Sequence, residues 1–234
     1  MKLSIVIPAF NEEKYIGPCL ESVLSRSKDT RFKTEIIVIN NASTDGTKSV
    51  AQSYGVRVID EEKKGLTKAR QRGLEEAHGE LIAYIDADTR VPHNWFSNIE
   101  HAFNANPQII CLSGPYRYYD GPWYVRYTLI VMWYLTAPIT YLFVGYMVLG
   151  GNFVVKKDAL LKTGGFDPSI DFYGEDTDIA RRLNQFGKVI FDMKFFIYSS
   201  TRRFTKEGFF IIAFRYALNY AWEVIFHRPF TSRT

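Results

Sequence analysis

Two aspartates one residue apart, Asp86 and Asp88, follow an apolar run that ends abruptly at Ile85. The run from 81 to 85 is short and rich in β-branched and aromatic residues, which favours a buried strand. If the chain stays extended, the two carboxylates lie on the same side and repel one another unless a cation neutralises them. Hard oxygen ligands suit Mg²⁺ or Mn²⁺, which in turn bind diphosphates. The alternative is an ordinary polar turn, because loops are rich in aspartate.

Other polar residues stand where neighbouring strands are expected to end. Apolar strands are predicted at 3–7, 35–39, 56–59 and 81–85, with helices between them up to about residue 24, after residue 46 and over 66–77. This alternation predicts parallel βαβ units, in which ligands bind at the carboxyl ends of the strands. The polar residues after these ends are Asn11, Asn40, Asn41, Asp45, Asp86 and Asp88. We therefore expect one polar edge on an α/β sheet.

The second half of the chain is less regular. We expect helices at 94–104, 158–162 and 174–186, strands at 109–112, 153–155, 189–191 and 195–198, and a strongly aromatic helix at 208–226. The chain carries no charged residue between Tyr127 and Val155, and the stretch 128–149 is long enough to be a membrane-spanning candidate.

Composition restricts the class of protein. A chain of 234 residues with 47% hydrophobic content fits one α/β domain. The net charge of +4 suggests an anionic ligand or a membrane surface, and does not indicate nucleic acid. Cys19 and Cys111 match no metal or redox spacing and imply no disulfide framework, so we expect a reducing cytoplasm. The apolar run at the start of the chain is too short for a signal peptide.

A series of motifs resembles, in this order, those of the family 2 glycosyltransferases of the GT-A fold, which transfer a sugar from a nucleotide diphosphate donor with inversion. The motifs lie at 8–12, 40–43, 65–73, 86–88, 150–152 and 174–176, and the resemblance runs from residue 3 to about 205. It implies an α/β GT-A domain with a central, mostly parallel sheet over 1–234. Within it, 1–115 would bind the nucleotide sugar, 116–149 would be an apolar insert, 150–205 the acceptor and catalytic half, and 206–234 an aromatic C-terminal helix.

The resemblance also implies roles for individual residues. Asp88, with Asp86, would hold Mn²⁺ or Mg²⁺ and so stabilise charge on the leaving phosphate. Asp176 would be the general base that deprotonates the acceptor hydroxyl, with Glu175 binding or orienting beside it. The residues expected to contact the donor are Pro8, Ala9, Glu12, Asn40, Asn41, Arg70, Asp86, Ala87, Asp88, Gly151, Asn152, Arg202 and Arg203.

Structural interpretations compete with these roles. Glu175 and Asp176 could simply be the acidic first turn of a helix. Arg202 and Arg203 could be ordinary surface charges. The chain also departs from the family at Asn41, where members often carry an acid that accepts the imide N–H of uracil. An amide both donates and accepts, so Asn41 could still pair with uracil, and Asp45 could substitute from a nearby position. UDP is therefore the first expectation for the donor, with GDP and dTDP open.

The apolar stretch constrains the catalytic interpretation. If it crossed a bilayer once, Asp88 and Asp176 would lie on opposite sides and could not share a site. Pro138 and Gly145 would divide it into two short halves that fold back or lie at the interface, where its aromatic rings are favoured. We therefore expect a cytoplasmic protein peripheral to the inner face of the membrane, with a glycan or lipid-linked acceptor. A buried core or dimer interface and a true span are the alternatives.

Other classes fit less well. The motif 86–89 superficially resembles that of haloacid-dehalogenase-type phosphatases, but its threonine is one position early and it lies far from the chain start. A nucleotidyltransferase would need a glycine-rich opening in place of Pro8 to Asn11. A non-catalytic, membrane-associated nucleotide-sugar binder would keep Asp88 but lose Asp176.

Overall fold

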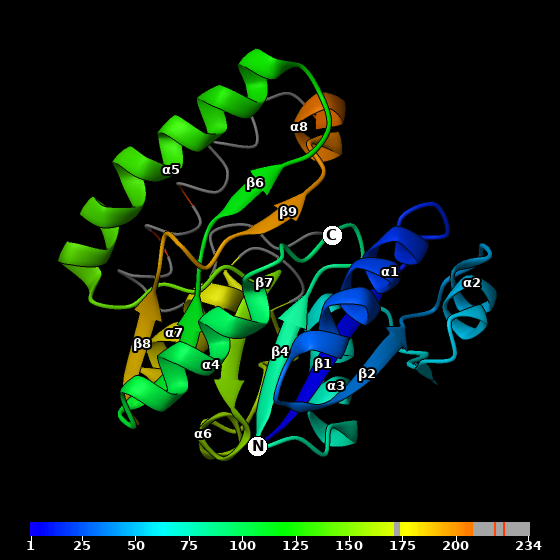
Figure 1. Cartoon of the computed structure of the whole chain (residues 1–234), viewed down its shortest axis with the longest axis horizontal. Coiled ribbons are helices and arrows are strands. Elements are labelled where there is room, and N and C mark those ends of the chain that lie inside the picture. The colour runs from blue at the N-terminus through cyan, green and yellow to red at the C-terminus, as the bar shows by residue number, and fades with distance from the viewer. Residues whose placement is uncertain (171–173, 208–217, 219–221, 223–234) are drawn as a thin grey trace.

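The computed structural model describes residues 1–170, 174–207, 218 and 222. The aromatic helix expected at 208–226 therefore falls almost wholly outside the described residues, and the description below concerns the part before it. Figure 1 shows a central sheet with helices on both faces and one long helix set apart from them.

The main sheet of the described residues has seven strands in the order β3-β2-β1-β4-β7-β5-β8. All neighbouring strands are parallel except β7, which runs antiparallel to both β4 and β5. The start of β7 therefore lies at the edge where the other strands end. The strands are β1 (Lys2–Ala9), β2 (Lys33–Asn40), β3 (Arg57–Asp60), β4 (Leu81–Ile85), β5 (Ile109–Ser113), β7 (Asn152–Lys156) and β8 (Lys188–Phe191).

Strand alternation divides the core into two layers. In β1, Leu3, Ile5 and Ile7 face one hydrophobic cluster, while Val6 faces the other, as a two-residue period requires. Helices α1 (Ile16–Arg26), α2 (Thr47–Ser53) and α4 (Trp95–Ala105) contribute to the first cluster. Helices α3 (Leu66–Glu76), α6 (Lys157–Lys162) and α7 (Glu175–Leu183) contribute to the second.

A two-stranded sheet stands beside the main one. It pairs β6 (Tyr116–Tyr118) with β9 (Ile197–Ser199) in parallel, and α8 (Arg202–Glu207) follows β9. The sequence did not predict β6. This small sheet brings the segment before the apolar stretch next to the segment that carries Arg202.

The apolar stretch corrects one expectation. Pro138 does not divide it: α5 (Trp123–Val144) is one helix of 22 residues that runs through Pro138 and ends at Gly145, whose φ is 81°. Pro138 only removes one backbone donor, and the hydrogen bonds of the turns on either side keep the helix continuous. By length and composition alone α5 could cross a membrane, because its most apolar window has a mean hydropathy of 1.5. Only 11% of that window is buried, whereas a core helix would be mostly buried.

Contacts along α5 hold it beside the domain. The Trp133 ring stacks on Phe191 with centroids 6.0 Å apart, and the Tyr141 hydroxyl donates to the Val189 carbonyl at 2.9 Å. Its outer side chains are exposed, including Trp123 at 76%, Leu142 at 80% and Phe143 at 83%. Both ends of the helix return to the same domain, as seen in Figure 1.

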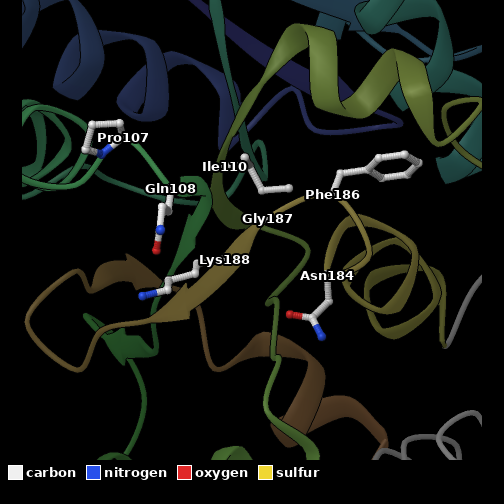
Figure 2. A pocket seen from close by; sticks show the side chains of 7 residues that line it. All are labelled: Pro107, Gln108, Ile110, Asn184, Phe186, Gly187 and Lys188. Atoms are coloured by element: carbon white, nitrogen blue, oxygen red, sulfur yellow. The ribbon is translucent and has the colours of Figure 1, made fainter.

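A hollow of about 490 Å³ lies at the opposite end of the sheet from the polar edge (Figure 2). It is lined by residues at the starts of β5 and β8 and by the turn that follows α7, among them Gln108, Asn184 and Lys188. It therefore does not belong to the site predicted at the strand ends.

Candidate active site

The carboxylates predicted from sequence meet where the strands end. Asp86 directly follows β4, Gly151 directly precedes β7, and Glu175 begins α7. Because β7 is antiparallel, residues before it share an edge with residues after β4. The two halves of the chain thus build one site.

Arg70, from α3, lies at the centre of this edge. Its side chain is 2% exposed, with Nη1 3.1 Å from Glu175 Oε1 and Nη2 3.7 Å from Asp86 Oδ1. Burial opposes its charge, but Glu175, Asp86 and Asp176 together raise the pKa of the guanidinium above its usual value. Arg70 is therefore a fixed positive charge, and it pairs with Glu175, which lies 105 positions later in the chain.

Gly151 is required by the position of Asp86. The Tyr116 hydroxyl donates to Asp86 Oδ2 at 3.0 Å. A Cβ on Gly151 would lie 2.1 Å from that oxygen and 2.2 Å from the Tyr116 hydroxyl. A side chain there would displace Asp86. Gly151, which was expected to contact the donor, thus lies against a carboxylate of the protein itself.

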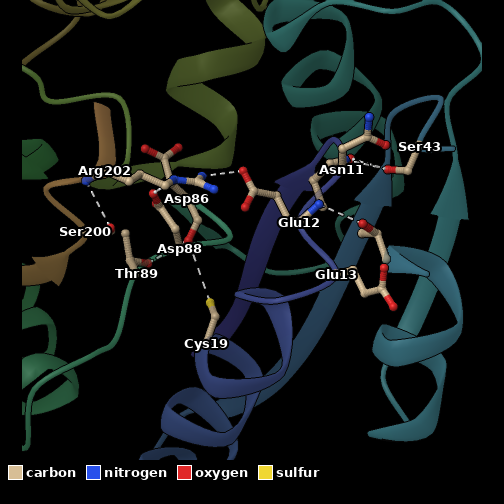
Figure 3. A network of polar contacts seen from close by, with 12 residues as sticks. Asn11, Glu12, Glu13, Cys19, Ser43, Asp86, Asp88, Thr89, Ser200 and Arg202 are labelled. Carbon is tan, nitrogen blue, oxygen red and sulfur yellow. Dashed lines mark hydrogen bonds and ion pairs between the residues drawn. The ribbon is translucent and has the colours of Figure 1, made fainter. Parts of the chain in front are cut away.

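Asp88 is paired with a cation from the end of the described chain (Figure 3). Arg202 Nε donates to Asp88 Oδ2 at 2.9 Å, and Arg202 Nη2 pairs with Glu12 Oε1. Burial and the charge of Asp86 nevertheless raise the pKa of Asp88 to about 6. The second oxygen of Glu12 is buried and has no hydrogen-bond partner among the residues that the structure describes. The three groups thus hold more negative than positive charge.

Asp176 has the features of a base. It accepts hydrogen bonds from the Gly150 N–H at 3.3 Å and the Thr177 N–H at 2.9 Å. Burial first, and then the charge of Glu175, raise its pKa to about 7. Asp176 can therefore exchange a proton near neutral pH, whereas the charge of Glu175 is balanced by Arg70.

Asn41, which was expected to contact the nucleoside of the donor, forms hydrogen bonds within the protein. The Asn41 amide donates to the carbonyls of Glu61 and Lys63, at 3.1 and 2.9 Å, and accepts from the Gly65 N–H at 2.8 Å. It is 4% exposed and both hydrogens of its amide are used within the protein, which leaves one lone pair on Oδ1, so its contact with the donor stays a prediction. Its role is to hold the loop before α3.

Asp60 was missed from sequence. It ends β3 opposite Asn40, whose Nδ2 donates to Asp60 Oδ1 at 2.8 Å, and its other oxygen pairs with Lys48. Its position as the last residue of a strand at the polar edge was the signal that could have found it. Pro8, Ala9 and Ala87 line the same edge as buried residues.

Asn152 also departs from its predicted role. It is fully buried, its Oδ1 accepts from the Trp95 indole N–H at 3.0 Å, and its Nδ2 donates to the carbonyls of Gly114 and Phe195. These bonds join β7 to the β5–β6 connection and leave nothing for a donor. Arg203, next to Arg202 on α8, is close enough to Asp88 to lower the pKa of that carboxyl.

The donor set fits a divalent cation that shares its ligands with phosphate. Among the described residues, no three His, Cys, Asp or Glu side chains are grouped to hold a metal ion. Mg²⁺ and Mn²⁺, however, commonly bind through one or two carboxylates and complete their shell with water and substrate phosphate. Asp88 and Asp86, with the unpartnered oxygen of Glu12 nearby, provide such a pair.

Sequence comparison finds relatives for much of the chain. The family model described as Glycosyl transferase family 2 matches residues 4–164. Glycosyltransferase AglE from Haloferax volcanii is 32% identical over 99 residues, which are 40% of this chain and 32% of that protein. Dodecaprenyl-phosphate galacturonate synthase from Rhizobium johnstonii is 35% identical over 95 residues, 38% of this chain and 28% of that protein. The chain thus spans about a third or less of these curated relatives.

Solved structures share the fold over nearly the whole chain. The mannosyltransferase PcManGT from Pyrobaculum calidifontis, in complex with GDP-Man and Mn²⁺, superposes with a TM-score of 0.70 at 19% identity, covering 96% of this chain and 64% of that one. S. aureus TarS 1-349, in complex with UDP-GlcNAc, gives 0.67 at 20% identity, covering 86% and 58%. These similarities confirm the predicted GT-A fold.

Proposed function

The chain belongs to glycosyltransferase family 2, and from this premise we propose that it is an inverting transferase that moves a sugar from a nucleoside diphosphate to a hydroxyl group. The observation that carries the proposal is that Asp176, a carboxylate with a pKa of about 7, shares one sheet edge with the Arg202–Asp88 pair. Transfer needs both a proton acceptor and positive charge near the leaving phosphate. This edge supplies the two together.

Asp88 and Asp86 would hold Mn²⁺ or Mg²⁺, which, when bound, stabilises negative charge on the leaving diphosphate. The complex of PcManGT with GDP-Man and Mn²⁺ supports this choice of cation. Arg202 adds a guanidinium whose planar fork matches phosphate oxygens. Arg70 stays with Glu175 and Asp86, and so orients the Asp86 carboxylate.

Asp176 takes the proton of the acceptor hydroxyl as that oxygen attacks the anomeric carbon from the face opposite the diphosphate. Its hydrogen bonds from Gly150 and Thr177 hold the carboxylate in place. Glu175 is a positioning residue, because its ion pair with Arg70 ties the start of α7 to the sheet edge. A non-catalytic nucleotide-sugar binder would have no use for a base held in this way.

The donor base is proposed to be uracil first, with guanine and thymine open. Structural neighbours were solved with GDP-Man and with UDP-GlcNAc, so the fold accepts both a purine and a pyrimidine. With Asn41 engaged in the loop before α3, Asp60 is proposed, beside Asp45, as a carboxylate at this edge that accepts a base N–H. Its side chain is 49% exposed, so a ligand can reach it.

The acceptor is proposed to be a glycan or lipid-linked molecule, reached at the inner face of a membrane on which α5 lies. The support is the exposed apolar side of α5 and the similarity to the Rhizobium johnstonii relative, a dodecaprenyl-phosphate galacturonate synthase. Tryptophan and tyrosine at the start of α5 suit headgroup depth, whereas Leu142 and Phe143 at its end suit the acyl region.

A thermal-shift screen of UDP-, GDP- and dTDP-sugars, with and without Mn²⁺, tests the donor. A bound donor stabilises the folded state by mass action, so one class of nucleotide should raise the melting temperature and do so more with Mn²⁺. Asp88→Ala should abolish the Mn²⁺-dependent part, while Asp158→Ala, at an exposed carboxylate on α6, should not. No shift with any nucleotide sugar would refute the proposed function.

Flotation with vesicles of phosphatidylcholine and phosphatidylglycerol tests the membrane surface. Replacing both Leu142 and Phe143 by serine should release the protein from the vesicles. The matched control replaces Leu161 and Phe186, which are exposed at 56% and 47% outside α5. Equal flotation of the two double variants would exclude α5 as the binding surface.

A further inference from the structure

The turn that precedes Arg202 is held by one carboxylate outside the site described above. Asp120 Oδ2 accepts from the Ser200 hydroxyl at 2.6 Å, and Asp120 Oδ1 accepts from the Thr201 N–H at 2.6 Å and the Thr201 hydroxyl at 3.0 Å. Burial acts to raise the pKa of Asp120, but these hydrogen bonds lower it overall. The carboxylate is therefore ionised at neutral pH, and Ser200 and Thr201 donate these three hydrogen bonds to it.

The small sheet explains this meeting. Strands β6 and β9 pair in parallel, with Tyr118 opposite Ser199, so the residues that follow the two strands run side by side. Gly121 completes the contact: its φ is 78°, and a Cβ there would lie 2.2 Å from the Thr201 hydroxyl oxygen. The close fit leaves the Thr201 turn little freedom relative to Asp120.

Arg202 follows this turn directly. Its backbone N–H donates to the Ser200 hydroxyl oxygen at 3.1 Å, and that same hydroxyl donates to Asp120. From here its side chain reaches Asp88 and Glu12 across 114 and 190 positions of sequence. Two hydrogen bonds thus link Asp120 to the backbone of Arg202, and the Arg202 side chain extends from there to Asp88 and Glu12.

We propose that Asp120 is a positioning residue for the transfer: it fixes the turn that presents Arg202 to Asp88 and to the donor diphosphate. The part that concerns the diphosphate rests on the proposed function, whereas the part that concerns Asp88 holds without any ligand. Asp120 is not among the residues at the polar edge of the sheet, and we assign it no contact with the reacting atoms. Because it stands two residues before the N-cap of α5, it also joins the start of that helix to Arg202.

The ligand-free part is tested by the arginine Nε–H signals in a ¹H–¹⁵N spectrum. The Arg202 signal, assigned by its loss in Arg202→Lys, should exchange slowly with water because it donates to Asp88. In Asp120→Ala the exchange should quicken about tenfold or more, and in Asp120→Asn by less, because the amide keeps one acceptor. Asp192→Ala is the matched control, since Asp192 also caps a turn, at the Lys194 N–H.

Backbone amide signals of β1 and β4 report whether each variant is folded. An Arg202 signal that is unchanged in folded Asp120→Ala would overturn the proposal. If Asp120→Ala does not fold, the same comparison is made with Asp120→Asn, and an unchanged signal there would overturn it equally.

Affinity for the nucleoside diphosphate found in the screen, measured by calorimetry, tests the second part. Arg202→Ala should weaken binding about tenfold to a hundredfold, the range expected for a hydrogen bond to a charged group. Asp120→Ala should reproduce most of this loss, and the double variant should be no weaker than Arg202→Ala. Losses that multiply in the double variant would overturn the positioning role. No binding by the unaltered protein would refute the proposed function and leave the Nε–H result to decide whether Asp120 positions Arg202.

Discussion

Replacing Arg70 by methionine removes the positive charge that the two halves of the site share. The Glu175 carboxylate is 8% exposed and 3.1 Å from Arg70, a separation worth about 5 kcal/mol of attraction at an effective dielectric constant of about 20. Asp86 is 3.7 Å away but 37% exposed, so solvent screens that pair more strongly. Desolvation offsets much of the attraction, and breaking a buried pair costs about 3–5 kcal/mol because one charge stays buried.

Urea unfolding at neutral pH, followed by circular dichroism, measures this loss. The double variant Arg70→Met/Glu175→Gln removes both charges and should be more stable than Arg70→Met alone by about 2 kcal/mol or more. Arg72→Met is the matched control on the same helix: Arg72 pairs with Glu76 at 2.8 Å, but its side chain is 39% exposed. Its loss should stay below about 1 kcal/mol.

Two results would refute this reasoning. One is a free energy of unfolding that falls no further in Arg70→Met than in Arg72→Met. The other is a double variant that is no more stable than Arg70→Met. Either would mean that the Arg70–Glu175 pair does not hold α7 to the sheet edge.

Three further outcomes follow from the geometry. If Asp176 is the base, as proposed, its pKa of about 7 predicts that kcat/KM rises with pH through about 7 and then levels off, and this rise should be absent from the residual rate of Asp176→Asn. Ala42 has a φ of 56°, so Ala42→Gly should relieve left-handed strain and raise the free energy of unfolding by up to about 1 kcal/mol; a loss of stability in urea would contradict this. Gly151→Ala should displace Asp86 and weaken donor binding by about tenfold or more in calorimetry, and unchanged affinity would mean that Asp86 does not serve the donor.

The framework of this fold could be predicted because its signals are local. The strand at 81–85 is bounded by Glu80 and Asp86, and the structure has β4 over those same residues. Chain order and alternation likewise predicted the parallel strands and the polar edge. The helix expected directly after Asn11 begins only at Ile16, because Asn11, Glu12 and Glu13 are taken up by contacts with the 43–47 loop.

The partners of individual side chains could not be predicted, because they depend on distant parts of the chain. An asparagine at a strand end can bind a ligand or bind the protein, and only the fold shows that Asn41 and Asn152 are already engaged. The direction of β7 depends on how the chain returns from α5. The contacts of Trp133 and Tyr141 in α5 with β8 likewise join segments that lie far apart in the sequence. The predicted roles of Asp88, Asp176 and Arg202 remain predictions for the experiments above.

Helix α5 departs from the catalytic edge and comes back to it. Just before it, the Tyr119 hydroxyl donates to the Asp88 carbonyl at 3.2 Å, and just after it the Gly150 N–H donates to Asp176. With α5 on a bilayer as proposed, no flexible tether separates the membrane from the bound sugar, so transfer takes place at one fixed height. Such an enzyme would select acceptor hydroxyls by their distance from the membrane. Hydroxyls near the lipid phosphate would be within reach, and those at the far end of a long glycan would not.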